Sequence, residues 1–449
     1  MEAVVTIEVD GLPLEELLKT AFSGSSLPDS NTSSPLSSLP SSPELKSTIL
    51  LPPLSEEDEQ KSTPNHAKRR GKASRKRKRG EKKMKAGLKG YDLPPPLKKR
   101  HVSEAATEPT SLLLTDIRAL ENGFTGHQST SGTKKTYTLD ELVGPDSKYK
   151  FRLIKWDGSK TMILLTKDRR ILVVFVGRPK DKAWVGVSQR VADRMQRHRA
   201  QARRYKKKKN RRGRYEAIAC GVTLGMGMKK PAVQKQPNAG SAAFVQELLD
   251  DEDVKRIVGV GSSAFSTWLP DLYQSYVENQ SELFQFDSSL KFPFDNSAFA
   301  ATTFNLGPQT VTIDHTDYHN RSDGFCAITP LSPTTGGFEY TKGGHLILWD
   351  LGVVVEFPPG TTALLPSAIL RHSNTVIGKG EQRSSLTQYT AGSLFRWVEH
   401  GFRCETSFYA GLNETELDLE LEKDACRWEN AANNFAYFDD LVCKVCQSL

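Results

Sequence analysis

The sequence predicts a mainly β protein with flanking helices (α+β), built around a double-stranded β-helix, or jelly-roll, core. Between residues 311 and 398, short runs rich in β-forming residues alternate with Gly/Pro turns. Phe357-Pro-Pro-Gly360 ends one such run, because proline cannot donate a hydrogen bond to a strand ladder. Many short, evenly spaced strands are typical of sandwiches and jelly rolls, which bring residues from distant strands into one mouth.

The first 135 residues are expected to contain little fixed structure. Residues 1–64 form an acidic tail rich in serine and proline. Residues 65–135 form a basic disordered segment and linker, with one possible helix near 111–121. The chain has 449 residues, which leaves room for one to two folded domains beside such tails.

The folded domain is predicted over residues 136–405. Three strands, at 151–156, 162–166 and 171–177, precede a basic helix at 183–212 whose apolar residues recur every three or four positions. Helices at 242–253 and 263–282 are expected to buttress the β-helix core, which runs over 296–400 and ends in strands at 385–389 and 393–398. Residues 406–449 form an acidic, helical C-terminal extension.

Three residues of this core have the pattern of a metal site. His315 and Asp317 stand two positions apart, so both side chains leave a strand on the same side, and His372 comes from a later strand. An isolated His-x-Asp is more often structural, but two imidazoles and one carboxylate form the facial triad of non-haem Fe(II) oxygenases. We therefore predict that His315, Asp317 and His372 bind Fe(II).

Arg383 and Ser385 follow on the next predicted strand, where a hairpin would return them to the metal. A guanidinium can bind a carboxylate through two parallel hydrogen bonds, and a hydroxyl two residues further on faces the same way. A cosubstrate with a distal carboxylate and a metal-chelating 2-oxo acid fits this arrangement. The sequence thus predicts 2-oxoglutarate as cosubstrate, with O₂.

These motifs resemble the TET/JBP family of 2-oxoglutarate/Fe(II) dioxygenases, which oxidise the 5-methyl group of cytosine or thymine in DNA. His-x-Asp-x-His-Asn, the later His and Arg-x-Ser-x-x-x-Tyr carry the likeness, and 304–308 and 389–397 look like the transposon-associated branch expanded in fungi. The resemblance implies that Asn320 hydrogen-bonds the edge of a flipped 5-methylcytosine and that Tyr389 stacks on it. Where family members often carry a second His, this chain has Ala391, which puts the identity of the base in doubt.

Two basic segments indicate a nucleic-acid partner, and the chain carries a net charge of +9. Residues 68–100 are read as a nuclear-localisation signal for an import receptor, against the alternative of a solvated tail. The second segment lies at the end of the basic helix, where the side chains expected to bind the DNA backbone are Arg203, Arg204, Lys206, Lys207, Lys208, Lys209, Arg211 and Arg212. We accordingly expect a nuclear protein, and no run is apolar enough to span a membrane.

Other functions remain open at this stage. The same site could demethylate N6-methyladenine in DNA or RNA, since a hydroxylated N-methyl group is unstable. A hydroxylase acting on RNA or protein would share the triad, and a non-catalytic, transposon-derived DNA-binding protein would share the fold. Six cysteines in a reducing compartment are expected to be free thiols, although Cys404, Cys426, Cys443 and Cys446 leave a zinc site open.

Overall fold

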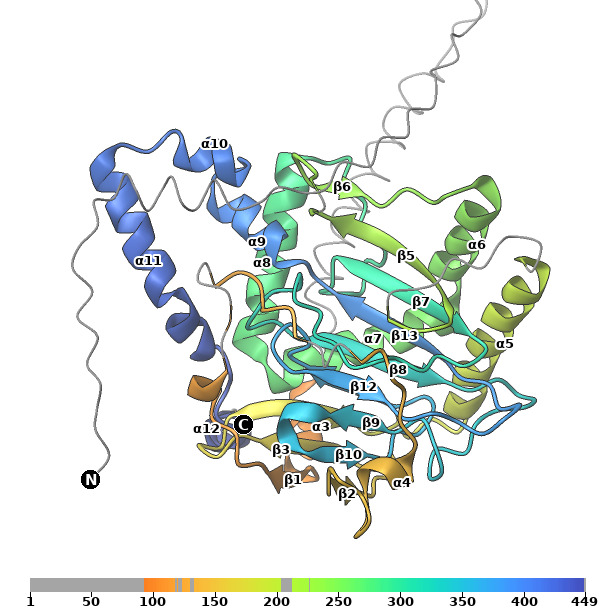
Figure 1. The fold of residues 1–449 in the computed structure, drawn as a ribbon. Coiled ribbons are helices and arrows are strands. Elements are labelled where there is room, and N and C mark those ends of the chain that lie inside the picture. Colours follow the sequence, from red (N-terminus) through yellow and green to blue (C-terminus); the bar gives the residue numbers. More distant parts are fainter. Residues whose placement is uncertain are drawn as a thin grey trace, which may run out of the picture. The chain divides into compact units, whose positions relative to one another are not determined.

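The computed structural model describes residues 93–117, 119, 123–129, 133–202, 212–225 and 227–447. The chain divides into two units, Met1–Asn65 and His66–Leu449, and all the described residues belong to the second. The tail predicted over 1–64 and most of the basic segment at 68–100 therefore lie outside the described residues. Two sheets with flanking helices make up the second unit, as the sequence predicted (Figure 1).

The larger sheet has nine strands. Its strands, in spatial order, are β1 (Ala106–Pro109), β3 (Met162–Leu165), β4 (Ile171–Val176), β11 (Thr362–Leu365), β8 (Cys326–Leu331), β13 (Ser384–Tyr389), β7 (Ala301–Gly307), β5 (Glu216–Thr223) and β6 (Ala232–Val233). All neighbouring strands are antiparallel except β1 and β3. Because β13 lies between β8 and β7, the start of β13 is held on both sides.

The smaller sheet lies across the core from the first. Its strands are, in order, β12 (His372–Asn374), β9 (Leu346–Leu348), β10 (Val353–Val355) and β2 (Arg152–Ile154). Beyond β12, the extended segment around His315 pairs with His372 in an antiparallel bridge. Pairing at the edge of the smaller sheet thus brings the segments at 315 and 372 together, as the predicted double-stranded β-helix requires.

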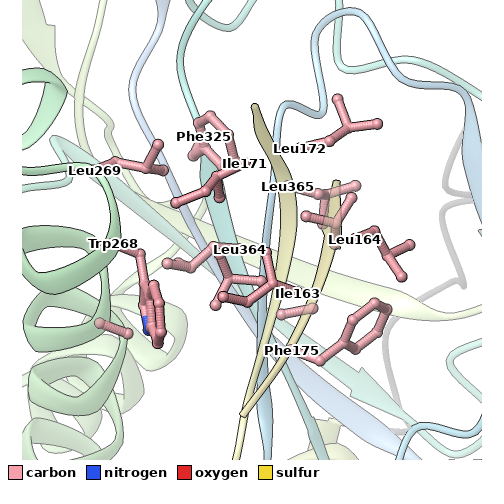
Figure 2. Packing of buried hydrophobic residues seen from close by; sticks show 14 of the residues in the cluster. Ile163, Leu164, Ile171, Leu172, Phe175, Trp268, Leu269, Phe325, Leu364 and Leu365 are labelled. Atoms are coloured by element: carbon pink, nitrogen blue, oxygen red, sulfur yellow. The ribbon is translucent and has the colours of Figure 1, made fainter. Parts of the chain in front are cut away.

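The main hydrophobic core fills the space between the sheets and the helices behind the larger one. Figure 2 shows Ile163 of β3 and Leu364 of β11 on the face of the sheet that Trp268 approaches from a helix, with Leu164 of β3 and Phe175 of β4 on the opposite face. These side chains are at most 2% exposed. Burying each such side chain stabilises the fold by about 1.5–3 kcal/mol before the entropy of ordering is subtracted, so β3 and β4 form a rigid support for the site strands.

Helices cover the outer face of the nine-stranded sheet. They are α5 (Trp184–Ala202), α6 (Ala239–Asp250), α7 (Glu252–Trp268) and α8 (Pro270–Phe286). The helix predicted over 263–282 is therefore two helices, because Pro270 occupies the first turn of α8 and cannot continue α7. Of the basic helix predicted over 183–212, the structure shows α5 and leaves 203–211 outside the described residues.

The segment 93–117, expected to be part of a disordered linker, carries regular structure instead. Helix α3 (Pro95–Ser103) buries Val102, and β1 pairs in parallel with β3 at the sheet edge. A short 3-10 helix, η1 (Leu114–Asp116), stands where a longer helix was predicted. The basic composition around 98–100 hid these elements, since one buried residue and an edge pairing leave almost no apolar pattern.

The remaining elements are short or follow the core. They are α4 (Leu139–Leu142), η2 (Trp349–Leu351), α9 (Gly392–Glu399), α10 (Glu405–Tyr409), α11 (Glu414–Ala432) and α12 (Phe438–Gln447). Helix α9 replaces the strand predicted at 393–398; Leu394 and Trp397, three residues apart, are its buried face. No described helix is long and apolar enough to cross a membrane.

Candidate metal centre and adjoining pocket

His315, Asp317 and His372 converge at one end of the space between the sheets. One ligand atom from each residue lies within 4.8 Å of the others, and His315 Nε2 is 3.6 Å from an Asp317 carboxylate oxygen. The backbones of His315 and His372 exchange hydrogen bonds of 3.1 and 3.0 Å, while the Asp317 N–H donates to Ser367 O at 2.7 Å. Backbone pairing therefore fixes all three side chains, and among the described residues this is the one such cluster.

The two imidazoles are oriented for a metal. Nδ1 of His315 is 2.8 Å from Ile313 O, and Nδ1 of His372 is 2.9 Å from Leu370 O. Each Nδ1–H thus donates to a carbonyl, which leaves both Nε2 lone pairs for a ligand. Burial, aided by the neighbouring His372, lowers the pKa of His315 to about 3, and burial also lowers the pKa of His372. Both rings are neutral at physiological pH, as metal binding requires.

The third ligand is held as a carboxylate. Burial alone would raise the pKa of Asp317, but the Arg212 guanidinium, His315 and His372 lower it to about 2. Two neutral imidazoles and one ionised carboxylate are the donor set of a facial-triad iron site. The residues therefore fit Fe(II).

Arg212 lies elsewhere than predicted. It was expected to bind a DNA phosphate, whereas its guanidinium forms an ion pair with Asp317 inside the pocket. The cause is local pairing: Ile313 N–H donates to Arg212 O at 2.9 Å, and Gly213 bridges Thr312. A Cβ on Gly213 would meet Val311 O at 2.4 Å, so glycine is required for this close approach.

Arg383 and Ser385 open onto the same cavity, which has a volume of about 370 Å³. Arg383 is 4% exposed, and its Nη1 donates to Thr310 O at 2.8 Å, but its Nε–H has no hydrogen-bond partner in the described structure. Burial lowers the pKa of Arg383 to about 10, so the group stays charged. Ser385 Oγ accepts a hydrogen bond from Asn305 Nδ2 at 3.0 Å and keeps its own hydrogen to donate.

Among the described residues, the buried Arg383 cation has no acidic counterpart. No ion pair joins it to a described carboxylate, in contrast to Arg212. A buried charge without a partner is costly, so such a group is expected to be completed by an anion. The cavity thus offers a metal triad and a separate carboxylate receptor.

The residues predicted to contact a base lie in the wall of this cavity. Asn320 Nδ2 donates to Ser367 Oγ at 3.0 Å, and the Tyr389 hydroxyl is 3.2 Å from Thr303 Oγ1. Ala391 also lines the wall and pairs with Asn320 in an isolated bridge. His319, interpreted from the sequence as structural, lies exposed at the edge of the same cavity.

The predicted DNA-contacting cations other than Arg212 lie outside the described residues: Arg203, Arg204, Lys206, Lys207, Lys208, Lys209 and Arg211. The preceding helix α5 is less available than its composition indicated. Arg190 pairs with Asp253 at 2.7 Å, and Arg194 pairs with Asp251. Acidic residues at the start of α7 thus balance part of the positive charge of α5. The sequence of α5 alone could not show this pairing.

The cavity also contains groups that the sequence did not single out. Tyr215 is 4% exposed, and burial raises the pKa of its hydroxyl to about 12. Gln234, which follows β6, also lines the cavity. Neither belongs to a motif, and only long-range strand pairing places them here. The six cysteines are free, and in the described structure none of them joins a group of metal-ligating side chains.

Comparisons with known proteins gave structural likenesses only. No family model and no curated protein matches the sequence. NgTET1 in complex with 5mC DNA is similar over 54% of this chain and 83% of its own, with 16% identity and a TM-score of 0.39. An oxidoreductase of the 2OG-Fe(II) oxygenase family from Burkholderia pseudomallei is similar over 48% and 84%, with 15% identity and a TM-score of 0.26. At these values function rests on the residues of the site.

Proposed function

We propose that this protein is an Fe(II)- and 2-oxoglutarate-dependent dioxygenase that oxidises the methyl group of 5-methylcytosine in DNA. The observation that carries the proposal is the unpaired Arg383 cation, buried in the same cavity as the triad of His315, Asp317 and His372. A triad alone would suit many metal reactions. A second, buried receptor for a carboxylate indicates a dicarboxylate cosubstrate that reaches from the metal to Arg383.

In this proposal His315, Asp317 and His372 hold Fe(II). Arg383 binds the distal carboxylate of 2-oxoglutarate through its guanidinium, and Ser385 donates a further hydrogen bond. When bound, Fe(II), 2-oxoglutarate and O₂ supply the oxidant for an unreactive C–H bond. The chain positions the substrate methyl group, and the burial of Asp317, His372 and Arg383 keeps water away from these groups.

A base in a duplex cannot reach this cavity, so the substrate nucleotide must leave the stack. Tyr389 would stack on the flipped base, and Asn320 would hydrogen-bond its edge. The sequence motifs at 304–308 and 389–397, with their resemblance to TET/JBP enzymes, support 5-methylcytosine in DNA as the substrate. The basic segments would bind phosphates and, at 68–100, a nuclear import receptor, which makes the protein nuclear.

N6-methyladenine in DNA or RNA is the second candidate substrate. Ala391 favours this substrate, because its small side chain leaves more room for a purine than a larger residue at this position of the cavity would. A non-catalytic DNA-binding role is less consistent with the structure. Such a protein would not need two neutral imidazoles, an ionised carboxylate and a buried cation around one cavity.

The deciding experiment supplies the protein with Fe(II) and 2-oxoglutarate under anaerobic conditions, then with air and a duplex containing 5-methylcytosine. Mass spectrometry of the digested nucleosides should show 5-hydroxymethylcytosine or further oxidised bases, and Arg383→Ala should yield none. A parallel duplex with N6-methyladenine tests the second candidate. Failure on both duplexes, with 2-oxoglutarate still bound, would exclude both proposed bases in duplex DNA.

A further inference from the structure

The β5–β6 hairpin forms one wall of the cavity and is held in place next to the predicted base pocket. Val222 and Thr223 pair with Val233 and Ala232. The hydroxyl of Ser393, in the first turn of α9, donates to Leu224 O and ties the hairpin to the segment that carries Ala391. From this hairpin Leu224, Gly225, Met228 and Gln234 line the cavity. Any base that enters must therefore meet the hairpin.

Gln234 is placed to contact such a base. Its backbone N–H donates to Gly221 O at 2.8 Å, which fixes the residue at the end of β6. Its side-chain Oε1 is buried and has no hydrogen-bond partner among the described residues. Gln236, two residues on, uses its amide instead to donate to Ala219 O at 2.8 Å. Since buried amide oxygens nearly always find a donor, Gln234 is available to a ligand in the cavity.

The floor beneath Gln234 leaves room for a base. Strands β13, β7 and β5 run side by side, and their facing residues on the cavity side include Thr387, Thr303 and Ala219, in register. Short side chains on these strands thus leave room in the cavity that Gln234 and Tyr389 also line.

Asn320 and Ala391 line the same cavity. The amide nitrogen of Asn320 donates to Ser367, so its carbonyl oxygen is the group available to accept from a base. Ala391 offers no polar atom. A base edge with an amino donor and ring acceptors, such as that of cytosine, needs a second polar partner, and an amide can supply it.

The outer side of the hairpin is cationic. Lys229, Lys230 and Lys235 are exposed and flank the cavity-lining residues Met228 and Gln234. None of the three lysines forms an ion pair with a described residue, unlike Arg190 and Arg194 on α5. Unpaired lysines next to a cavity for a nucleotide are suited to the phosphates on either side of it.

We propose that the β5–β6 hairpin is the substrate-recognition arm of this protein. Gln234 hydrogen-bonds the edge of the flipped base, together with Asn320, and replaces the polar contact that Ala391 cannot make. Lys229, Lys230 and Lys235 bind the flanking phosphates. The inference rests on the proposed function, because it presupposes a nucleic-acid base in the cavity.

The base contact is tested with Gln234→Ala and Gln234→Asn, using Gln236→Ala as the matched control that removes an amide from the same hairpin. We expect Gln234→Ala to lower kcat/KM for a 5-methylcytosine duplex at least ~10-fold, the loss of one good polar contact. Gln234→Asn should recover part of it. Gln236→Ala should retain the wild-type kcat/KM, and all variants should bind 2-oxoglutarate as the wild type does in the anaerobic Fe(II) complex.

The outcomes distinguish failure of the proposed function from failure of the Gln234 assignment. If the wild type binds 2-oxoglutarate but oxidises no base in DNA, the proposed function fails and the Gln234 assignment fails with it. If the wild type oxidises the duplex and Gln234→Ala does so within twofold of it, only the Gln234 assignment is overturned.

The phosphate contact is tested by DNA binding without turnover. Fluorescence anisotropy of a labelled duplex, measured over a range of salt concentrations, gives the slope of log Kd against log salt. Replacing Lys229, Lys230 and Lys235 by alanine should reduce that slope by about 2–3, because each phosphate contact contributes about 0.9. Lys155→Ala, an exposed lysine following β2, should leave it unchanged. An unaltered slope in the triple variant would overturn the assignment of the lysines.

Discussion

Single residues determine the chemistry of the site, because the hydrogen bonds of each side chain leave one of its atoms available to a ligand. His315 and His372 each commit Nδ1 to a carbonyl two residues earlier in the chain. Arg383 commits one nitrogen to Thr310 O and leaves Nε–H in the cavity. Ser385 accepts from Asn305 and can still donate. Each side chain is therefore oriented before any ligand arrives, which reduces the entropy lost on binding.

Replacing His372 by alanine should remove a metal ligand without disturbing the rest of the fold. We expect Fe(II) affinity to fall by more than about 100-fold, because even residues that only orient a ligand contribute 10- to 100-fold. Equilibrium dialysis with Fe(II) under anaerobic conditions measures this. DNA affinity should remain within about twofold, and Fe(II) binding equal to that of the wild type would refute the metal assignment.

Arg383→Lys separates charge from geometry at the cosubstrate site. Lysine keeps the positive charge, but it cannot form two parallel hydrogen bonds with a carboxylate. We expect the Kd for 2-oxoglutarate to rise by roughly 10-fold or more, equivalent to about 1.4 kcal/mol or more, with little change in Fe(II) affinity. Titration of 2-oxoglutarate into the anaerobic Fe(II) protein provides the measurement. An unchanged affinity would mean that Arg383 does not bind the distal carboxylate.

The sequence predicted those residues of the site that stand at a characteristic spacing on one strand. His315 and Asp317, or Arg383 and Ser385, can be recognised two positions apart. Arg212 could not be recognised, because its place depends on backbone pairing with residues near 312, about a hundred positions away. Within the basic run it is indistinguishable from its neighbours, and only the structure shows that it faces Asp317.

At the scale of elements, the local sequence pattern predicted the strands at the start of the folded domain but not the helix near its end. Strands β2, β3 and β4 lie within the ranges that their apolar runs predicted. Helix α9 was taken for a strand because Leu394, Phe395 and Trp397 are as frequent in strands as in buried helices. Packing decided the outcome: Leu394 and Trp397 face the same cluster as Val222 and Leu283. Tertiary contacts of this kind are invisible in a short window.

Asp251 connects two elements and offers a test of how α5 is held. Its side chain accepts from Val254 N–H at 2.9 Å as the N-cap of α7, and it also pairs with Arg194 of α5. Asp251→Ala should lower the free energy of unfolding by about 1–3 kcal/mol, since a lost N-cap costs about 1 and the arginine loses its half-buried partner. Urea denaturation monitors the change.

Asp251→Asn is the matched variant, because it retains the cap and removes only the charge. It should lose less stability than Asp251→Ala. Equal losses in both would mean that the ion pair, and not the cap, carries the effect. Both variants should bind 2-oxoglutarate normally, since α5 and α7 lie on the outer face of the sheet.

The whole molecule has an acid-sensitive interior because several histidines are buried in neutral form. Burial lowers the pKa of His345 and His400 to about 4 and that of His315 to about 3. In the unfolded chain each has an ordinary pKa near 6.5. Between pH 6.5 and 4 the unfolded chain therefore binds protons that the folded protein does not, and stability falls as the pH falls through this window.

His400 isolates this effect from the metal centre. It is 1% exposed, stacks on Phe408 with ring centroids 3.9 Å apart, and neither ring nitrogen has a hydrogen-bond partner in the described structure. After burial, the largest influence lowering its pKa is Arg396, and Glu399, Arg427 and Asp424 also face it. Phenylalanine would keep the ring stacking and remove the titrating group.

For His400→Phe we expect a flatter pH dependence of stability. Each pKa unit corresponds to about 1.4 kcal/mol, so at pH 5 the wild type should have lost about 2 kcal/mol at this residue that the variant keeps. Urea denaturation at pH 7.5 and pH 5 measures the difference. If both proteins lose the same free energy of unfolding, His400 is not buried in neutral form. The acid sensitivity would then arise from the other buried histidines. The packing of His400 against helices α10 and α11 would contribute nothing to it.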